Sequence, residues 1–118
     1  SEMRKHAPDH MSVPQFRVML KIGRQPQISA KEISEWMGIT PPTVSRMIDS
    51  LHARGWIKKQ TDKRDRRQTL LIITQNGQKS VNRYRAEVQA QLNEKMKHLS
   101  ITQQNHLKIG LEILESLF

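Results

Sequence analysis

Cysteine is absent from the 118-residue chain, and aromatic residues make up only 4% of it. The lack of cysteine excludes disulfides, thiolate catalysis, cysteine-based zinc sites and thiol redox sensing. The longest aliphatic run, residues 70–73, is far shorter than the roughly 20 apolar residues that span a bilayer, and no charged-then-apolar signal opens the chain. We therefore expect a soluble, cytoplasmic protein.

Apolar residues are also scarce, at 36% of the chain. A chain of this length has room for one compact domain, and its hydrophobic core would be thin in a monomer. We find no internal repeat, low-complexity tract or flexible linker. We therefore expect one structural unit that buries further surface by oligomerisation.

Positive charge, in contrast, is abundant. Lys and Arg number 20 against 11 Asp and Glu, which gives a formal net charge of +9. Residues 1–74 contain 14 basic and 7 acidic side chains, whereas residues 75–118 contain 6 and 4. A field of this sign favours nucleic acid or an anionic membrane surface as a partner. We expect the more basic part, residues 1–74, to face that partner.

Three capping boxes predict helix starts, because each places a Ser three residues before a Gln or Glu. They begin at Ser12, Ser29 and Ser100. The first helix is expected to end at Gly23 and Pro26, and the second at Gly38. The residues expected to be buried are Phe16, Met19, Leu20 and Gly23 in the first helix, and Ile33, Trp36 and Met37 in the second.

Another helix is expected to start at Thr40, only two residues after the preceding one. Thr40 is a typical N-cap residue, and proline is tolerated in the first turn that follows it. Apolar residues recur at helical spacing up to the stop at Gly55. They are Val44, Met47, Ile48 and Leu51. Two helices joined by a tight turn that contains glycine predict a helix-turn-helix.

The periodicity changes after Gly55. Residues 56–60 and 69–73 are rich in branched or aromatic side chains, and the polar residues 61–68 between them predict a β-hairpin with a charged tip. Thr74 is expected to cap a long helix, and the Ser100 box opens a final one. The apolar stripe of the long helix consists of Val81, Tyr84, Val88, Leu92, Met96 and Leu99, and that of the final helix of Leu107, Leu111, Leu114 and Phe118.

These motifs, in this order, resemble those of MarR-type transcriptional regulators. The similarity rests on Val13–Phe16, on Ile39–Arg46, on Leu51–Ile57, on the charged segment Asp62–Arg67, and on Leu70–Thr74 with Gly77 beyond it. The resemblance implies a mainly α fold with a small β-hairpin: a winged helix-turn-helix in residues 12–74 and C-terminal dimerisation helices in residues 75–118. Family members usually carry a long first helix, so residues 1–11 are expected to be the remnant of a truncated one.

The helix that begins after Thr40 is the expected recognition helix. A helix in the major groove of DNA presents the side chains near its N-terminus to base edges, and its backbone N–H groups to phosphate. The candidate contact residues are Thr40, Pro42, Thr43, Ser45 and Arg46. Arg46 could bind guanine O6 and N7, and Pro42 and Thr43 could contact a thymine methyl group. The alternative is that Thr40 only caps the helix and Arg46 is a solvated charge.

The hairpin tip is the expected wing, with Lys63, Arg64, Asp65, Arg66 and Arg67 as candidate site residues. The negative potential of the minor groove attracts inserted arginine. The resemblance implies that Arg67 enters this groove, that Asp65 orients the neighbouring arginines, and that Lys63 and Arg64 reach phosphates. The alternative is a solvated loop whose charge only keeps the protein soluble.

An enzymatic function is not predicted. The glycines are explained by helix ends and turns, and the histidines lack a nucleophile and carboxylate beside them. His6 and His10 have the i,i+4 spacing of a metal pair, but Pro8 between them weakens this reading. We expect no cofactor, no metal and no catalytic residue.

Together these observations predict a sequence-specific regulator that binds double-stranded DNA as a homodimer on inverted half-sites. The resemblance favours a ligand-responsive repressor with a small-molecule effector. Dimerisation is assigned to the stripe of the final helix, residues Leu107, Leu111, Leu114 and Phe118. The alternative is a winged-helix scaffold that binds protein partners or RNA through its basic face.

Overall fold

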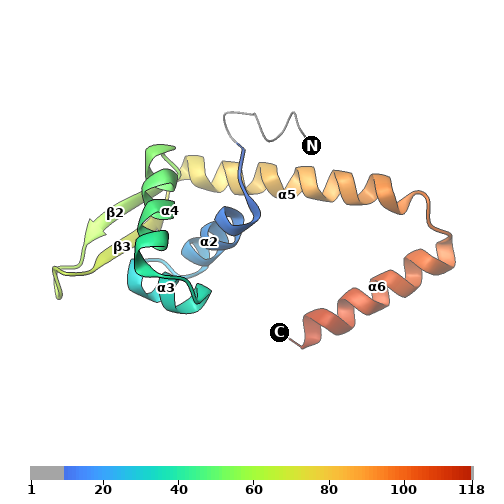
Figure 1. Ribbon diagram of the computed structural model, residues 1–118. Helices are drawn as coiled ribbons and strands as arrows, with labels where there is room; N and C mark the ends of the chain where they lie inside the picture. The colour runs from blue at the N-terminus through green and yellow to red at the C-terminus, as the bar shows by residue number, and fades with distance from the viewer. Residues whose placement is uncertain (1–9, 118) are drawn as a thin grey trace. The chain divides into compact units, whose positions relative to one another are not determined.

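The computed structural model describes residues 10–117, which form five helices and three short strands (Figure 1). In chain order these are α2 (Val13–Arg24), β1 (Ile28–Ser29), α3 (Ala30–Met37), α4 (Pro41–Ala53), β2 (Ile57–Thr61), β3 (Thr69–Ile73), α5 (Gln75–Met96) and α6 (Ile101–Ser116). This confirms the mainly α fold with a small hairpin. Residues 1–9, which make up most of the expected first-helix remnant and include the His6 of the possible metal pair, lie outside the described residues, and the described residues His10 and Met11 are not helical.

The predicted capping boxes start three of the helices. Ser12 Oγ accepts a hydrogen bond from the Gln15 backbone N–H at 3.2 Å, and the Gln15 side chain accepts one from the Ser12 N–H at 2.9 Å. The boxes at Ser29 and Ser100 have both bonds as well. Thr74 Oγ1 accepts from the Gly77 N–H at 2.9 Å, which confirms Thr74 as the cap of α5.

Helix α2 differs from the prediction in its end and in its buried face. It runs through Gly23 to Arg24, because one glycine lowers helix stability by only about 1 kcal/mol relative to alanine and the Gln25 N–H still binds the Lys21 carbonyl at 3.0 Å. Its fully buried residues are Val18, Met19 and Ile22. Of the residues predicted to be buried in α2, Phe16 and Leu20 are half-buried against the core, and Gly23 is exposed.

Trp36 was predicted to lie in the core of α3, and this prediction is wrong. Its side chain is 41% exposed, and the Arg17 guanidinium and the Lys21 ammonium each lie 5.3 Å from its ring centroid. The short helix α3 buries Ile33, as predicted, and also Ser34, whereas Met37 is half-buried. Two cations stacked on the indole stabilise its position at the surface.

The sheet has a third strand that the sequence pattern did not predict. All strands are antiparallel in the order β1-β3-β2, so β3 is central. Ile28 is paired with Leu71, and Lys59 is paired with Leu71 on the other side. Strand β1 has only two residues, too few to show an alternating pattern. The hairpin register places Thr61 opposite Thr69 and confirms the predicted hairpin.

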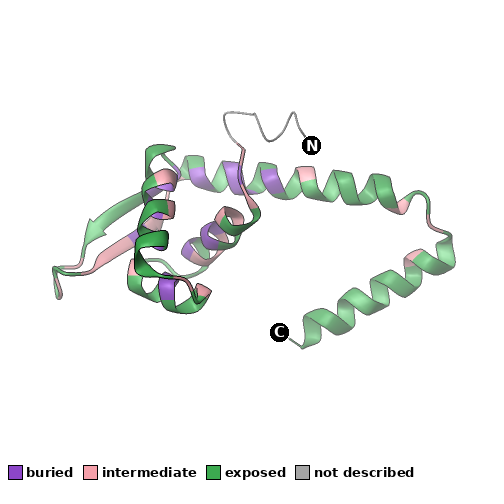
Figure 2. Ribbon diagram, in the orientation of Figure 1, coloured by how far each residue is buried: buried purple, intermediate pink, exposed green. Residues whose placement is uncertain are grey.

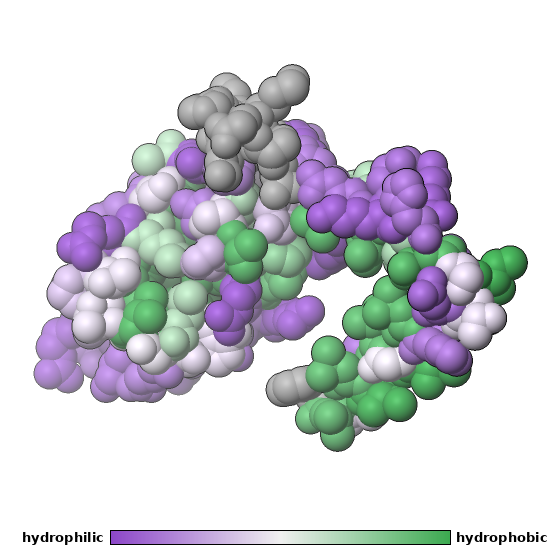
Figure 3. All heavy atoms as spheres, turned by 45° about the vertical axis from the view of Figure 1, so that its right-hand side comes forward, coloured by the Kyte–Doolittle hydropathy of each residue, from purple (hydrophilic) through white to green (hydrophobic). Residues whose placement is uncertain are grey.

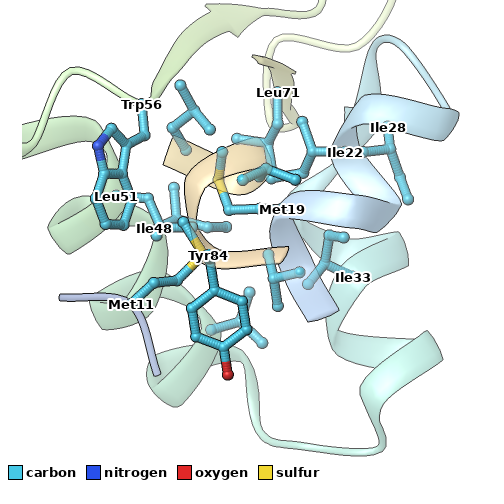
Figure 4. Packing of buried hydrophobic residues seen from close by; sticks show 14 residues of the cluster. Met11, Met19, Ile22, Ile28, Ile33, Ile48, Leu51, Trp56, Leu71 and Tyr84 are labelled. Carbon is cyan, nitrogen blue, oxygen red and sulfur yellow. The ribbon is translucent and has the colours of Figure 1, made fainter. Parts of the chain in front are cut away.

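The core gathers side chains from α2, α3, α4, the sheet and the start of α5 (Figure 4). It consists of Met11, Val18, Met19, Ile22, Ile28, Ile33, Val44, Ile48, Leu51, Trp56, Ile57, Leu71, Val81 and Tyr84. Both larger aromatic residues of this core, Trp56 and Tyr84, are buried, and Tyr84 belongs to the predicted stripe of α5. The compact unit therefore includes the start of α5 and ends after Tyr84. The functional division at residue 74 stays a prediction.

The second compact unit begins at Arg85 and contains the rest of α5 together with α6. Helix α6 has no buried residue, and Figure 2 shows it as almost wholly exposed. Apolar side chains gather along this helix in Figure 3. Those of its predicted stripe are 37%, 45% and 51% exposed for Leu107, Leu111 and Leu114, whereas Phe118 lies outside the described residues. Within residues 10–117, no helix has both the length and the hydropathy needed to cross a membrane.

Candidate nucleic-acid interface

Helices α3 and α4 meet at a tight turn that fixes the position of α4. Gly38 ends α3 with a left-handed φ of 67°, a conformation that favours glycine. The Ser34 hydroxyl then donates to the Ile39 carbonyl at 2.6 Å across the turn. Helix α4 buries Val44, Ile48 and Leu51 as predicted. Its opposite face is free to meet a partner.

That exposed face contains all five predicted recognition residues, Thr40, Pro42, Thr43, Ser45 and Arg46. Thr40 is the N-cap residue of α4 as predicted, but its side chain makes no capping hydrogen bond. Its hydroxyl instead pairs with the Thr43 hydroxyl at 2.9 Å, and Arg46 Nη2 donates to Thr43 Oγ1 at 3.5 Å. The three side chains form a polar row along α4.

The first turn of α4 is poor in backbone donors. Pro41 and Pro42 occupy its first two positions, and proline has no N–H. Thr43 is therefore the first residue of α4 with a backbone N–H, and the next N–H, that of Val44, donates to the Thr40 carbonyl at 3.1 Å. Since free N–H groups at a helix start are what usually hold a phosphate, α4 depends on side chains for such contacts.

Contacts at the C-terminal half of α4 hold it against the hairpin. Lys59 Nζ of β2 lies 3.1 Å from Asp49 Oδ1 of α4. The Trp56 N–H donates to the Leu51 carbonyl at 3.1 Å, and the Arg54 guanidinium stacks 4.7 Å from the Trp56 ring centroid. These contacts pack the recognition helix against the hairpin within one compact unit.

Two aspartates fold the hairpin tip. The Asp62 N–H donates to the Gln68 carbonyl at 3.0 Å, and Asp62 Oδ1 accepts from the Arg64 N–H at 2.9 Å. The Gln68 N–H donates to the Asp65 carbonyl at 3.0 Å. Asp62 was not among the predicted site residues. An aspartate two residues before a bonded N–H is a known turn signal and could have identified it.

Asp65 holds Arg67 through three hydrogen bonds. Its Oδ1 accepts from the Arg67 backbone N–H at 3.1 Å and from Nε at 3.0 Å, and its Oδ2 accepts from Nη2 at 3.3 Å. The side-chain bonds first, and then the backbone bond, lower the pKa of Asp65, so its carboxylate stays ionised at a lower pH than that of an unperturbed aspartate. Arg67 is 91% exposed, and the pairing fixes its direction without burying it.

The remaining predicted wing residues, Lys63, Arg64 and Arg66, are all exposed. Within residues 10–117, their side chains form no ion pair or hydrogen bond. Their charges are therefore available to an anionic partner. Within that same range, no group of three His, Cys, Asp or Glu side chains is arranged to hold a metal ion.

A groove between α4 and the wing is lined by residues from both predicted sets, the recognition residues and the wing residues. Ser45 of α4 lies on one side and Arg67 on the other, with Asp65, Gln68 and Thr69 beside it. The groove is also lined by Ala30 and Lys31 at the start of α3. Lys31 was missed because nothing in the sequence distinguishes it from a solvated lysine. Its positive charge is near enough to contribute to the lowered pKa of Asp65, after the bonds to Arg67.

A helix-turn-helix followed by a basic hairpin on a three-stranded sheet defines a winged-helix protein. The model of the MarR family matches residues 11–69, half of the chain, and the chain belongs to this family. This confirms the resemblance that its motifs indicate.

Three proteins illustrate what the chain is similar to in sequence and in fold. It is 25% identical over 104 residues to YfiV of Bacillus subtilis (strain 168), described as an uncharacterized HTH-type transcriptional regulator, with 88% of this chain and 65% of YfiV covered. The crystal structure of YusO from Bacillus subtilis has a TM-score of 0.80 at 20% identity, covering 92% of this chain and 77% of YusO. Streptococcus pneumoniae FabT in complex with DNA has a TM-score of 0.68 at 20% identity, covering 98% and 81%. The chain thus spans about two thirds of the length of YfiV.

Proposed function

We propose that this protein is a transcriptional regulator that binds double-stranded DNA sequence-specifically as a homodimer. The observation that carries the proposal is the exposed polar face of α4 beside a wing with four exposed cations, Lys63, Arg64, Arg66 and Arg67. The name of YfiV as a transcriptional regulator and the DNA complex of FabT support it. The net charge of +9 has the sign that DNA requires.

Each element has a distinct role in this proposal. Helix α4 enters the major groove, where Arg46 binds a guanine edge and Pro42 and Thr43 contact a thymine methyl group. The wing enters the adjacent minor groove through Arg67, which Asp65 holds in its outward direction. Lys63 and Arg64 bind phosphates on either side.

The apolar side chains of α6 support the homodimer. A single chain leaves Leu111 and Leu114 about half exposed, and a second copy would bury them. Two chains related by a twofold axis present two recognition helices to half-sites about 34–36 Å apart, which gives an inverted repeat. Repression and response to a small-molecule effector are proposed on the family membership alone.

The proposal predicts a steep salt dependence of DNA binding. If the dimer neutralises about eight phosphates, a plot of log affinity against log salt concentration has a slope of about −7. Footprinting of the region upstream of the protein's own gene identifies a bound sequence. Fluorescence anisotropy with a labelled duplex of that sequence then measures this slope. A slope near zero contradicts the proposal. Tighter binding to RNA competitors than to duplex DNA would instead support the scaffold alternative.

Two arginine variants separate the two kinds of DNA contact. Arg67→Ala is expected to weaken binding to all related duplexes by about 1–3 kcal/mol, because it removes a wing cation. Arg46→Ala is expected to change which base is preferred at one position of each half-site. Binding to a set of duplexes with single base changes measures both effects. Equal losses on every duplex from both variants would reject this division of roles.

A further inference from the structure

The groove between α4 and the wing has a third wall that the proposed function does not use. Helix α3 packs against both α4 and β3, so its first residues lie between the two DNA-reading elements (Figure 1). Lys31 is exposed there, and no ion pair or hydrogen bond within residues 10–117 engages its ammonium group. Ser45 is exposed on the facing side of the groove.

The geometry of the DNA duplex determines which part of the DNA would lie in this groove. In B-DNA a major groove and the adjacent minor groove are separated by one sugar-phosphate strand. A protein that inserts a helix into one groove and a wing into the other must therefore straddle this strand. The surface between α4 and the wing, lined by Lys31, Ser45 and Arg67, is the part that faces it.

The charges and donors in the groove suit a phosphate. Asp65 is its one acidic lining residue, and both carboxylate oxygens already accept hydrogen bonds from Arg67. Lys31 therefore contributes a positive charge that interacts with Asp65 only through space and forms no ion pair with it, and Ser45 contributes a hydroxyl donor. Since Pro41 and Pro42 remove two backbone donors from the start of α4, these side chains supply contacts that the recognition helix itself lacks.

We propose that Lys31 and Ser45 form a phosphate-binding site for the DNA strand that passes between the recognition helix and the wing. The inference rests on the proposed DNA-binding function and adds a specific contact to it. Lys31 binds the phosphate as a charge, and Ser45 donates a hydrogen bond to the same strand. Both act on every sequence alike, because a phosphate contact fixes the register of the protein on DNA and reads no base.

The first test compares two lysine variants of the full chain by their salt slopes. Lys31→Gln is expected to reduce the magnitude of the slope by about 1.8 for a dimer, because each neutralised phosphate contributes about 0.9. Lys58→Gln is the matched control. Lys58 is also exposed, but it alternates with Lys59, which faces α4, and so it lies on the other face of the sheet. The salt slope of the Lys58→Gln variant should equal that of the parent protein.

Ser45→Ala distinguishes a hydrogen bond from a charge. It is expected to weaken binding several-fold on all duplexes while leaving the slope unchanged, because the hydroxyl carries no charge. A Ser45→Ala variant that instead alters the preference for one base would assign Ser45 to base reading and remove it from the phosphate site.

A duplex with single methylphosphonate substitutions identifies the phosphate itself. Each substitution removes one negative charge. The parent protein should lose most affinity when the substituted phosphate lies between the major groove that α4 enters and the minor groove that the wing enters. Lys31→Gln should be insensitive to that substitution and as sensitive as the parent to the others. An unchanged slope, or a Lys31→Gln variant still sensitive at that position, overturns the phosphate site but leaves the proposed function intact. A parent protein that binds no duplex overturns both.

Discussion

Leu114→Asp is expected to dissociate the protein into monomers and to lower its affinity for a duplex with two half-sites by at least about 100-fold. Leu114 is 51% exposed in one chain and lies on the apolar stripe of α6. A carboxylate in the proposed contact between two copies would be desolvated without a partner. Loss of the dimer removes the second reading helix, whose binding is effectively intramolecular and raises affinity by about 10²–10⁴.

Sedimentation of the parent and the variant measures the oligomeric state, and fluorescence anisotropy measures DNA binding. Asn105→Asp is the matched control, because residue 105 is exposed and nine positions from Leu114, on the opposite side of the helix. It adds the same charge and should leave the dimer intact. A parent that is monomeric at micromolar concentration yet binds DNA tightly would reject the dimer mechanism. A variant that stays dimeric would place the contact elsewhere, for example at Leu92 of α5, which is 40% exposed.

Gly77→Ala is expected to destabilise the winged-helix unit by about 3 kcal/mol or more, which corresponds to a fall in Tm of roughly 10–20 °C. A Cβ atom at Gly77 would lie 2.1 Å from the Trp56 carbonyl oxygen and 2.9 Å from Met19 Cε. The methionine could move, but the carbonyl is backbone and already accepts from the Thr74 N–H at 3.0 Å. The substitution therefore forces α5 away from the end of α4 and the start of the hairpin.

Thermal and urea unfolding followed by circular dichroism measure this change. Gly23→Ala is the control, since Gly23 also lies within a helix and its added Cβ would meet only Ile73 Cδ1, at the ordinary distance of 3.7 Å. Alanine has the higher helix propensity, so Gly23→Ala should be neutral or stabilising by up to about 1 kcal/mol. Equal stability of the two variants would show that α5 does not pack this closely on the Trp56 backbone.

Much of the candidate site could be predicted because its signals are local. A Ser three residues before a Gln or Glu specifies a helix start from neighbouring backbone atoms alone, as at Ser12 and Ser29. The apolar spacing of Val44, Ile48 and Leu51 fixes which face of α4 is buried, and so which face remains exposed. Asp65 lies two residues before Arg67, close enough for the pairing that the family resemblance implies.

The positions that were predicted wrongly or missed depend on contacts between distant parts of the chain. Trp36 has the spacing of a core residue, but α2 places Arg17 and Lys21 against its ring and leaves it at the surface. Strand β1 exists only because β3 offers it a pairing edge at Leu71. Lys31 gains its position only through the packing of α3 against α4 and β3.

The sequence by itself thus determined the order of the helices and the hairpin, the buried face of α4 and the family, because helix caps, hydrophobic periodicity and turn residues act over a few neighbouring residues. The tertiary structure decided which exposed side chains share a surface. Lys31 and Arg67 are 36 positions apart in the chain, and only the packing of α3 beneath α4 and the wing brings them to one groove. No local pattern in either segment predicts that Lys31 and Arg67 line the same groove, because this depends on how α3, α4 and the hairpin pack around one core.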